Sequence, residues 1–462
     1  MRVLAVTIGR RPVVLAVCET VAITLAVWLG SWLVLGREAT LVFSGATLPK
    51  ALLITLVCQV SLYYADLYEL RVGDHRELFV GIVHALSATS FVLAAIYFWA
   101  PSLEIAPRVF VASVFFVMMS VAGCRFAFEW LMGHTGPRER LLVVGTGPGA
   151  VSLARELFDR RQELGVEIVG FIDPDPSRVG APVINPGVIG TIEDVPSIVR
   201  ARNVNRVVVS LGDERGKLPM DTLLEMKLQG VSFDHLASVY EELTGKIAVQ
   251  NLRPSWLIFS EGFRNSRWVA SAKRLIDLAA ALSGLLVAAP IMALVALAVR
   301  LTSPGPVLYS QQRVGRQGRL FTVYKFRSMR QDAEAATGAV WAQKNDVRVT
   351  PIGRFMRKTR LDELPQLWNV LVGDMSLVGP RPERPEFVQR LTEQIPFFGM
   401  RHVVRPGLTG WAQVRYSYGA SVEDAMQKLQ YDLFYIKNLS IALDLFIILS
   451  TIKTVILRKG AV

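Results

Sequence analysis

Two adjacent acidic residues, Asp362 and Glu363, lie in a stretch that is rich in arginine and lysine. The basic residues come both before and after the pair: Arg354, Arg357, Lys358, Arg360, Arg381 and Arg384. An ionised carboxylate among cations can attack a phosphorus atom, and a second carboxylate beside it can hold Mg²⁺. Covalent phosphoryl transfer requires this combination. Asp362 is therefore the candidate nucleophile, and both acids are candidate magnesium ligands.

The residues after the acidic pair predict a helix with one buried side. From the residue before the pair onward, apolar residues recur at helical spacing: Leu361, Leu364, Trp368 and Leu371. Pro365 is tolerated only in a first helical turn, which places Asp362 near the N-cap. Unpaired backbone N–H groups and the helix dipole should then keep this carboxylate ionised and attract phosphate. An Asp-Glu pair that only caps a helix is the structural alternative.

A second group of basic residues lies upstream, in the stretch QQRVGRQGRLFTVYKFRSM (residues 311–329). Its arginines are spaced by three, with glycines between them: Arg313, Gly315, Arg316, Gly318 and Arg319. Glycine lets the backbone approach an anionic ligand, and arginine binds phosphate. The alternation over residues 321–326 predicts a strand that carries Lys325 to the site. A solvated basic surface is the alternative interpretation.

Both stretches resemble those of a known family. The stretch LDELPQLWNVLVGDMSLVGPRP (residues 361–382) and the upstream one are similar to bacterial polyprenol-phosphate sugar-1-phosphate transferases, the monotopic enzymes that initiate exopolysaccharide and O-antigen assembly. The resemblance extends from about Lys273 to the C-terminus and includes RHVVRPGLTGWAQVR (residues 401–415). After residue 415 the family usually has a short Asn-Gly-Arg turn, which this chain lacks. The departure leaves the sugar specificity open.

The resemblance implies transfer of a sugar 1-phosphate from a UDP-hexose to undecaprenyl phosphate, with release of UMP. It implies that Asp362 forms an acyl phosphate and that Glu363 helps to hold Mg²⁺ and assists the second step. It implies that Lys325, Arg357 and Arg381 neutralise the diphosphate. Arg313 and Arg327, in the upstream basic stretch, are further candidate substrate-binding residues. Catalysis would occur at the cytoplasmic face of the bacterial inner membrane, as the first membrane step of exopolysaccharide, O-antigen or capsule synthesis. A homo-oligomer is left open.

The composition predicts a multi-domain membrane protein. Of the 462 residues, 52% are hydrophobic, which exceeds the norm for soluble proteins. The net charge of +12 suits anionic lipid headgroups, nucleotides or phosphorylated lipids, and no nucleic-acid-binding motif appears. The five histidines lack metal-ligand spacing, so a zinc site is not expected. A four-span transmembrane region over residues 1–133 is predicted from the apolar stretches 13–35, 48–67, 77–100 and 109–132.

Residues 134–267 predict a Rossmann-like α/β domain. A buried strand leads into Gly145-x-Gly147-x-x-Ala150, and a second strand ends at Asp173. These four residues are candidate nucleotide-binding residues, although such a turn also serves plain βα packing. A non-enzymatic regulator that senses a nucleotide through this loop is therefore one alternative function.

The triplet Asp173-Pro-Asp175 is interpreted as a turn with two exposed acids. A second function would follow if it held a metal instead. The protein would then be a DxD-dependent membrane glycosyltransferase, which releases UDP and not UMP. The nucleotide product therefore separates the two enzyme hypotheses.

Residues 268–462 form the predicted catalytic domain, a monotopic α/β fold with a re-entrant membrane helix over residues 273–302. This helix has basic residues at both ends and Pro290 near its midpoint, where proline bends the axis. A straight span would place the arginine-rich region outside, away from nucleotide sugars. A helix that enters and leaves on the cytoplasmic face avoids this, and the resemblance implies such a helix; a kinked transmembrane helix is the alternative. The apolar stretch 441–459 is expected to lie on the membrane or pack on this domain.

Overall fold

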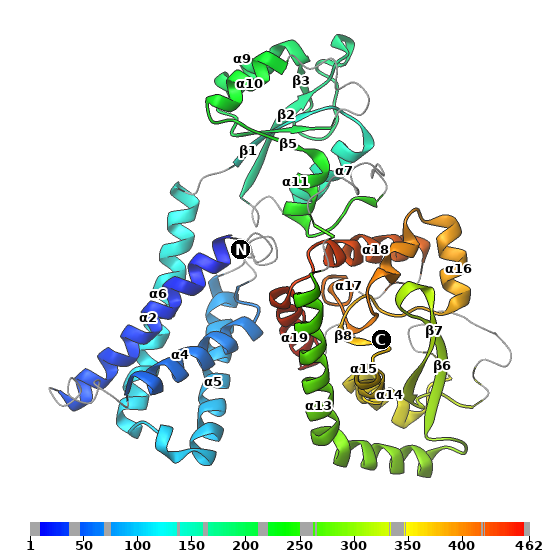
Figure 1. The fold of residues 1–462 in the computed structure, drawn as a ribbon. Coiled ribbons are helices and arrows are strands. Elements are labelled where there is room, and N and C mark those ends of the chain that lie inside the picture. Colours follow the sequence, from blue (N-terminus) through cyan, green and yellow to red (C-terminus); the bar gives the residue numbers. More distant parts are fainter. Residues whose placement is uncertain are drawn as a thin grey trace. The chain divides into compact units, whose positions relative to one another are not determined.

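The computed structural model describes residues 10–36, 47–68, 75–135, 139–159, 165–210, 220–249, 262–263, 266–331, 333, 346, 348–416, 419 and 421–456. The chain divides into two compact units, Met1–Leu236 and Ala237–Val462 (Figure 1). The first unit contains a helical bundle and a parallel sheet, and the second contains all of the candidate catalytic residues.

Within the described residues, the N-terminal bundle has four apolar helices: α2 (Arg10–Leu35), α4 (Thr47–Tyr64), α5 (His75–Trp99) and α6 (Pro107–Thr135). A short 3-10 helix, η1 (Pro101–Leu103), precedes α6. Three helices are long and apolar enough to cross a membrane, over Val13–Leu35, Leu78–Trp99 and Pro107–Phe128. The helix α4 has 18 residues, a length of about 27 Å, which is close to the thickness of a bilayer core. Apolar helices therefore occur at all four predicted stretches, and three of them have the length and hydropathy of a membrane span, whereas α4 is shorter.

A buried ion pair lies inside this bundle. The guanidinium Nε of Arg125 on α6 is 2.7 Å from Oε1 of Glu19 on α2, and Tyr68 donates a hydrogen bond to the same carboxylate. Charged groups within a membrane bundle are normally paired in this way. The pair therefore fixes which faces of α2 and α6 meet.

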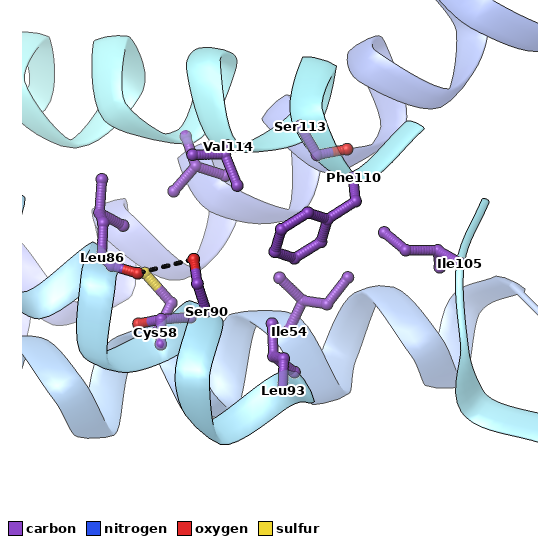
Figure 2. Close-up of a pocket in the computed structure, with 11 residues that line it drawn as sticks. Ile54, Cys58, Leu86, Ser90, Leu93, Ile105, Phe110, Ser113 and Val114 are labelled. Atoms are coloured by element: carbon purple, nitrogen blue, oxygen red, sulfur yellow. Dashed lines mark hydrogen bonds between the residues drawn. The ribbon is translucent and has the colours of Figure 1, made fainter. Parts of the chain in front are cut away.

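A small pocket lies in the bundle beside the side chains of α4, α5 and α6 (Figure 2). Its lining is apolar apart from Cys58 and three hydroxyl groups, on Thr89, Ser90 and Ser113. The Ser90 hydroxyl donates to the carbonyl of Leu86 in its own helix. No lining residue carries a charge, so this pocket is unsuited to a nucleotide diphosphate.

The described strands of the first unit form a five-stranded parallel sheet of order β3-β2-β1-β4-β5. Its strands are β1 (Glu139–Val144), β2 (Val166–Ile172), β3 (Val188–Gly190), β4 (Arg206–Val209) and β5 (Ser232–His235). The connecting elements include α7 (Pro148–Asp159), η2 (Pro176–Arg178), η3 (Ile192–Asp194), α9 (Val195–Ala201) and α10 (Met220–Leu228). The strand order reverses beside β1, as in Rossmann-like folds, which confirms the predicted α/β class.

The second unit is built from short elements around one long helix. Its first half contains α11 (Leu236–Thr244, which begins at the boundary), α13 (Arg267–Thr302), β6 (Leu308–Val314), η6 (Arg316–Gly318), β7 (Leu320–Phe326), α14 (Pro351–Thr359), η7 (Leu361–Glu363) and α15 (Gln366–Val372). The second half contains β8 (Ser376–Val378), α16 (Pro385–Gln394), η8 (Phe398–Val403), β9 (Gly407–Thr409), α17 (Trp411–Arg415), α18 (Val422–Lys437) and α19 (Ile441–Ile456). An antiparallel hairpin joins β6 to β7, and β8 pairs with β9 in parallel.

The helix α13 contains Pro290 and is bent into two arms (Figure 1). Both arms pack against other elements of the second unit. Ala281 on the first arm lies in an apolar cluster with Val370, and Val299 on the second arm lies in one with Met356. Proline removes a helical hydrogen bond, which accounts for a bend within an otherwise continuous helix.

Polar side chains tie the first arm of α13 to the rest of the unit. Lys273 Nζ is 2.6 Å from Oδ2 of Asp444 on α19. Arg274 donates to the carbonyl oxygens of Val370 and Leu371 at 2.7 and 2.9 Å, which satisfies the open end of α15. Asp277, buried on α13, accepts a hydrogen bond from the backbone N–H of Leu377 at 3.0 Å. The first arm is therefore fixed on the unit that carries the acidic pair.

The N-terminal boundary of the second unit differs from the predicted one at residue 268. Trp411 Nε1 donates to the carbonyl oxygen of Gly245 at 2.9 Å, and the N–H of Ile247 donates to the carbonyl oxygen of Gln430 at 3.1 Å. Glu241 also forms an ion pair with Lys437 on α18. Residues 237–249 therefore pack on α17 and α18, and the structure divides at residues 236 and 237.

Candidate active site

The acidic pair lies in η7, the short turn between α14 and α15. Arg360 directly before it has a φ of 58°, a left-handed conformation that ends α14 and redirects the chain. The predicted N-cap role of Asp362 is wrong, because α15 begins at Gln366 and Pro365 occupies the cap position. Neither η7 nor α15 has a side-chain cap hydrogen bond. The carboxylate of Asp362 is therefore not engaged in capping.

Glu363 is the centre of a cationic cluster. Its Oε1 atom lies 2.9 Å from Lys325 Nζ and 2.8 Å from Arg381 Nη2, and Arg360 Nη1 lies 4.0 Å away. Burial favours the neutral acid, but the cations of Lys325, Arg381 and Arg360 outweigh it and hold the pKa of Glu363 well below its usual value. Glu363 is thus charged at neutral pH and orients the cationic groups of Lys325 and Arg381 toward its Oε1 atom.

Asp362 has a different environment from its neighbour. Its side chain is buried, and its Oδ1 atom has no hydrogen-bond partner among the residues that the structure describes. Burial, and next the negative charge of Glu363, raise the pKa of Asp362, while Lys325 and Arg357 oppose the rise. The expected stabilisation of the ionised form by a helix dipole is therefore not what governs this acid. Two adjacent carboxyl groups with opposite pKa shifts are suited to different chemical roles.

Asn369 connects the acidic pair to the strand that carries Lys325. Its side-chain oxygen accepts from the N–H of Tyr324 at 3.2 Å, and its Nδ2 donates to the carbonyl of Thr322 at 2.7 Å. Asn369 is only 1% exposed, so both bonds are shielded from water. This amide was not singled out from the sequence, and the helical spacing gave no signal for it. The spacing predicts burial on the side of Leu364 and Trp368, whereas Trp368 is 53% exposed and Asn369 lies on the side that is buried.

The remaining predicted substrate-binding residues have different contacts. Arg357 Nε donates to Ser328 Oγ at 2.9 Å, and its charge acts on Asp362. The approach of α14 to Ser328 requires glycine at position 353, since a Cβ there would lie 2.0 Å from the Ser328 carbonyl oxygen. Arg357 is therefore held near the acidic pair by the packing of α14.

Arg313 and Arg327 bind backbone and neighbouring side chains. Arg313 donates to the carbonyl of Pro382 at 3.1 Å and to Gln311 Oε1 at 2.6 Å. Arg327 is 5% exposed and donates to the carbonyl oxygens of Pro304 and Ser303 at 2.8 and 2.9 Å. The structure thus brings Lys325, Arg381 and Arg357 to the acids, while Arg327 closes the turn after α13.

Of the candidate nucleotide-binding residues, Gly145 and Gly147 follow β1, Ala150 lies in α7 and Asp173 follows β2. Gly145 has a φ of +110°, Gly147 has open space where a Cβ would be, and Ala150 is buried in α7. The carboxylate of Asp173 accepts hydrogen bonds from the Thr146 hydroxyl and from Nη1 of Arg178. Asp173, the acid at the position expected to bind a ribose, is therefore already hydrogen-bonded to side chains of its own domain.

The interpretation of Asp173-Pro-Asp175 as a turn is confirmed, but only Asp175 is exposed as predicted, because Asp173 is buried. The N–H of Asp175 donates to Asp173 Oδ1 at 3.0 Å, and Asp175 Oδ1 accepts from the N–H and hydroxyl of Ser177 at 3.0 and 2.8 Å. These are the local hydrogen bonds of an Asx turn. They do not favour a DxD metal site.

Asp362 and Glu363 are the residues of this site that could hold a magnesium ion. No group of three or more His, Cys, Asp or Glu side chains suited to a metal occurs in the described part of the chain. Mg²⁺, however, usually binds through one or two carboxylates together with substrate phosphates and water. The unpartnered oxygen of Asp362 beside Glu363 fits that donor set.

The bundle, the parallel sheet and this acid–cation cluster together define a membrane protein with a site suited to phosphoryl transfer. Residues 268–458 match the family described as bacterial sugar transferase, and residues 64–217 match one described as a CoA-binding domain. The chain belongs to the bacterial sugar transferase family, as the resemblance of its motifs predicted.

Several relatives of this chain have curated names. The UDP-N-acetylgalactosamine-undecaprenyl-phosphate N-acetylgalactosaminephosphotransferase of Aeromonas hydrophila is 44% identical over 227 residues, which cover 49% of this chain and 53% of that protein. The undecaprenyl-phosphate glucose phosphotransferase of Komagataeibacter xylinus is 36% identical over 70% of this chain and 60% of its own length. The UDP-glucose:undecaprenyl-phosphate glucose-1-phosphate transferase of Xanthomonas campestris pv. campestris is 34% identical over 74% and 73%. The matches thus span from about half to about three quarters of these relatives.

Proposed function

We propose that this protein transfers a sugar 1-phosphate from a UDP-hexose to undecaprenyl phosphate and releases UMP. The observation that carries the proposal is the buried carboxylate of Asp362, with an unpartnered oxygen, beside a Glu363 that binds Lys325 and Arg381. The names of the relatives support the lipid acceptor, and they include more than one hexose. The hexose is therefore left open.

The first step would be attack by an Asp362 oxygen on the phosphorus atom that carries the sugar. A carboxyl oxygen–phosphorus bond forms, the bond from that phosphorus to the bridging oxygen breaks, and its electron pair leaves with UMP. Lys325 and Arg381, oriented by Glu363, would neutralise the diphosphate. Arg357, which opposes the raised pKa of Asp362, would favour its ionised form.

In the second step, an oxygen of undecaprenyl phosphate would attack the same phosphorus atom. The bond to Asp362 breaks and regenerates the carboxylate, so that one phosphoanhydride has been exchanged for another. Bound Mg²⁺ would neutralise charge on the transferred phosphate, with Asp362 and Glu363 as its protein ligands. The equilibrium should be close to balanced.

The lipid substrate requires a membrane surface next to the site, and α13 would provide it. Both arms of α13 pack on the unit that carries the acids, while Leu286 and Val287 before Pro290 are 69% and 75% exposed. Exposed apolar side chains of this size indicate contact with lipid. We therefore infer that α13 enters and leaves the inner membrane on its cytoplasmic face, although its 36 residues are enough to cross.

Cysteine labelling tests this course of α13. Single cysteines at Ser271 and Thr302, in a chain without Cys18, Cys58 and Cys124, should both react only from the cytoplasmic side. Thr302 is preferred to Ser303 because the Ser303 hydroxyl accepts a hydrogen bond from Arg327. A cysteine at Ser102 in η1, between α5 and α6, is the control and should react from outside. Labelling of position 271 or 302 from outside would show that α13 spans.

Product analysis tests the reaction itself. Purified protein with a UDP-hexose and undecaprenyl phosphate should release UMP in equal amount to the lipid-linked sugar diphosphate. The measurement is chromatography of the uridine nucleotides, with UDP-glucose and UDP-N-acetylgalactosamine as the first donors. Release of UDP would instead indicate glycosyl transfer and would overturn the proposed function.

A further inference from the structure

The segment that carries Arg381 is held by its backbone carbonyl groups. Four successive carbonyl oxygens, from residue 380 to residue 383, each accept a hydrogen bond from a distant part of the unit. The donors are the N–H of Gly407, the side chain of Arg401, the side chain of Arg313 and the N–H of Val314, in that order. Pro380 and Pro382 have no N–H group, so the segment cannot be fixed by a regular strand ladder.

The donor to the Arg381 carbonyl is itself part of a buried ion pair. Arg401 Nη2 lies 3.0 Å from that oxygen and 2.8 Å from Oδ2 of Asp432 on α18. The side chains of Arg401 and Asp432 are 6% and 2% exposed. A buried ion pair contributes little net stability, because the cost of desolvation offsets the attraction. It does, however, fix the position of a guanidinium group.

We propose that Arg401 and Asp432 are positioning residues, which hold the backbone of Arg381 so that its guanidinium group meets Glu363 and the substrate diphosphate. This inference rests on the proposed function, since that function assigns Arg381 to the diphosphate. Arg381 Nη2 is 2.8 Å from Glu363 Oε1. Arg381 is therefore held at its carbonyl oxygen by Arg401 and at its guanidinium group by Glu363. Loss of either partner frees the carbonyl and lets the guanidinium move away from the reacting phosphate.

Asp432→Asn in the full chain tests the proposal, because it keeps the shape of the side chain and removes the charge that holds Arg401. We expect kcat for nucleotide release to fall about tenfold, with a smaller change in KM, as for an interaction that is stronger in the transition state. Glu423→Gln makes the same chemical change on an exposed part of α18 and should leave the rate unchanged. A wild-type rate for Asp432→Asn would overturn the proposal.

A double-mutant cycle separates positioning from a purely structural role. In an Arg381→Lys background, Asp432→Asn should have less than a threefold effect, because the group that it positions is already altered. Equal losses in both backgrounds would show that Asp432 acts elsewhere and would overturn the proposal. Arg401→Lys, which keeps the buried charge, provides the same cycle if Asp432→Asn does not fold. Rates are measured on whichever uridine nucleotide the wild type releases, so UDP release counts against the proposed function alone.

Discussion

Asp362→Asn should lower UMP release by at least about a thousandfold, because it removes the attacking charge and keeps the size of the side chain. The loss should be present even without lipid acceptor. Exchange of labelled UMP into UDP-hexose reports the first step alone, and the wild type should catalyse it without undecaprenyl phosphate. The variant should not. Turnover above a few per cent of the wild-type rate would contradict a covalent role for Asp362.

The stability of the same variant separates chemistry from folding. Asp362 is buried with an unpartnered oxygen, and burial raises its pKa, so its carboxylate does not stabilise the fold. Asp362→Asn should therefore have a melting temperature equal to or above that of the wild type. Asp374→Asn, the same change at an exposed position of the same motif, should retain activity.

Glu363→Gln should slow both steps of the reaction, because it weakens the ion pairs that orient Lys325 and Arg381.

The acidic pair and its cations could be predicted because they are local in the sequence. Asp362 and Glu363 are adjacent, and Arg381 lies in the same motif. Lys325 is on an alternating stretch that predicts a strand, and β7 brings it to Glu363. The parallel sheet was predictable for the same reason, since Leu141 to Val144 form a continuous apolar run and all are buried.

The environment of Asp362 could not be predicted in the same way. The sequence placed it at a helix N-terminus, but a left-handed Arg360 and a 3-10 turn separate it from α15. Burial then reverses the expected direction of its pKa. Such an effect depends on which side chains cover the turn, and no periodicity encodes it.

Contacts between distant residues account for the other differences. Arg327 lies within a motif of basic residues, yet it binds the turn at Ser303. Arg401 and Asp432 are 31 residues apart in the sequence and form a buried ion pair. Neither residue type nor spacing distinguishes these residues from those that face the substrate, because the distinction depends on the packing of α18 and η8.

The second large effect is expected when the chain is shortened to the catalytic unit, because the result depends on where the shortened chain begins. A chain that begins at Trp268 retains the whole match to the sugar transferase family. It lacks residues 237–249, which belong to the second unit and include four buried apolar side chains: Val239, Tyr240, Ile247 and Val249. Each buried apolar side chain contributes roughly 1.5–3 kcal/mol, so the loss approaches the whole stability of a typical domain, about 5–15 kcal/mol.

We therefore expect the chain from Trp268 to be unstable and inactive, whereas a chain from Leu236 should release UMP in detergent or nanodiscs. The longer chain keeps the hydrogen bond from Trp411 to Gly245 and the ion pair of Glu241 with Lys437. Melting temperature and UMP release are measured on both. Gly147→Asp in the full chain is the control: it alters the sheet domain where a Cβ has open space, and it should leave the phosphoryl chemistry in place. Equal stability and activity of the two truncated chains would show that residues 237–249 are dispensable, and inactivity of both would show that the first unit is needed to complete the site.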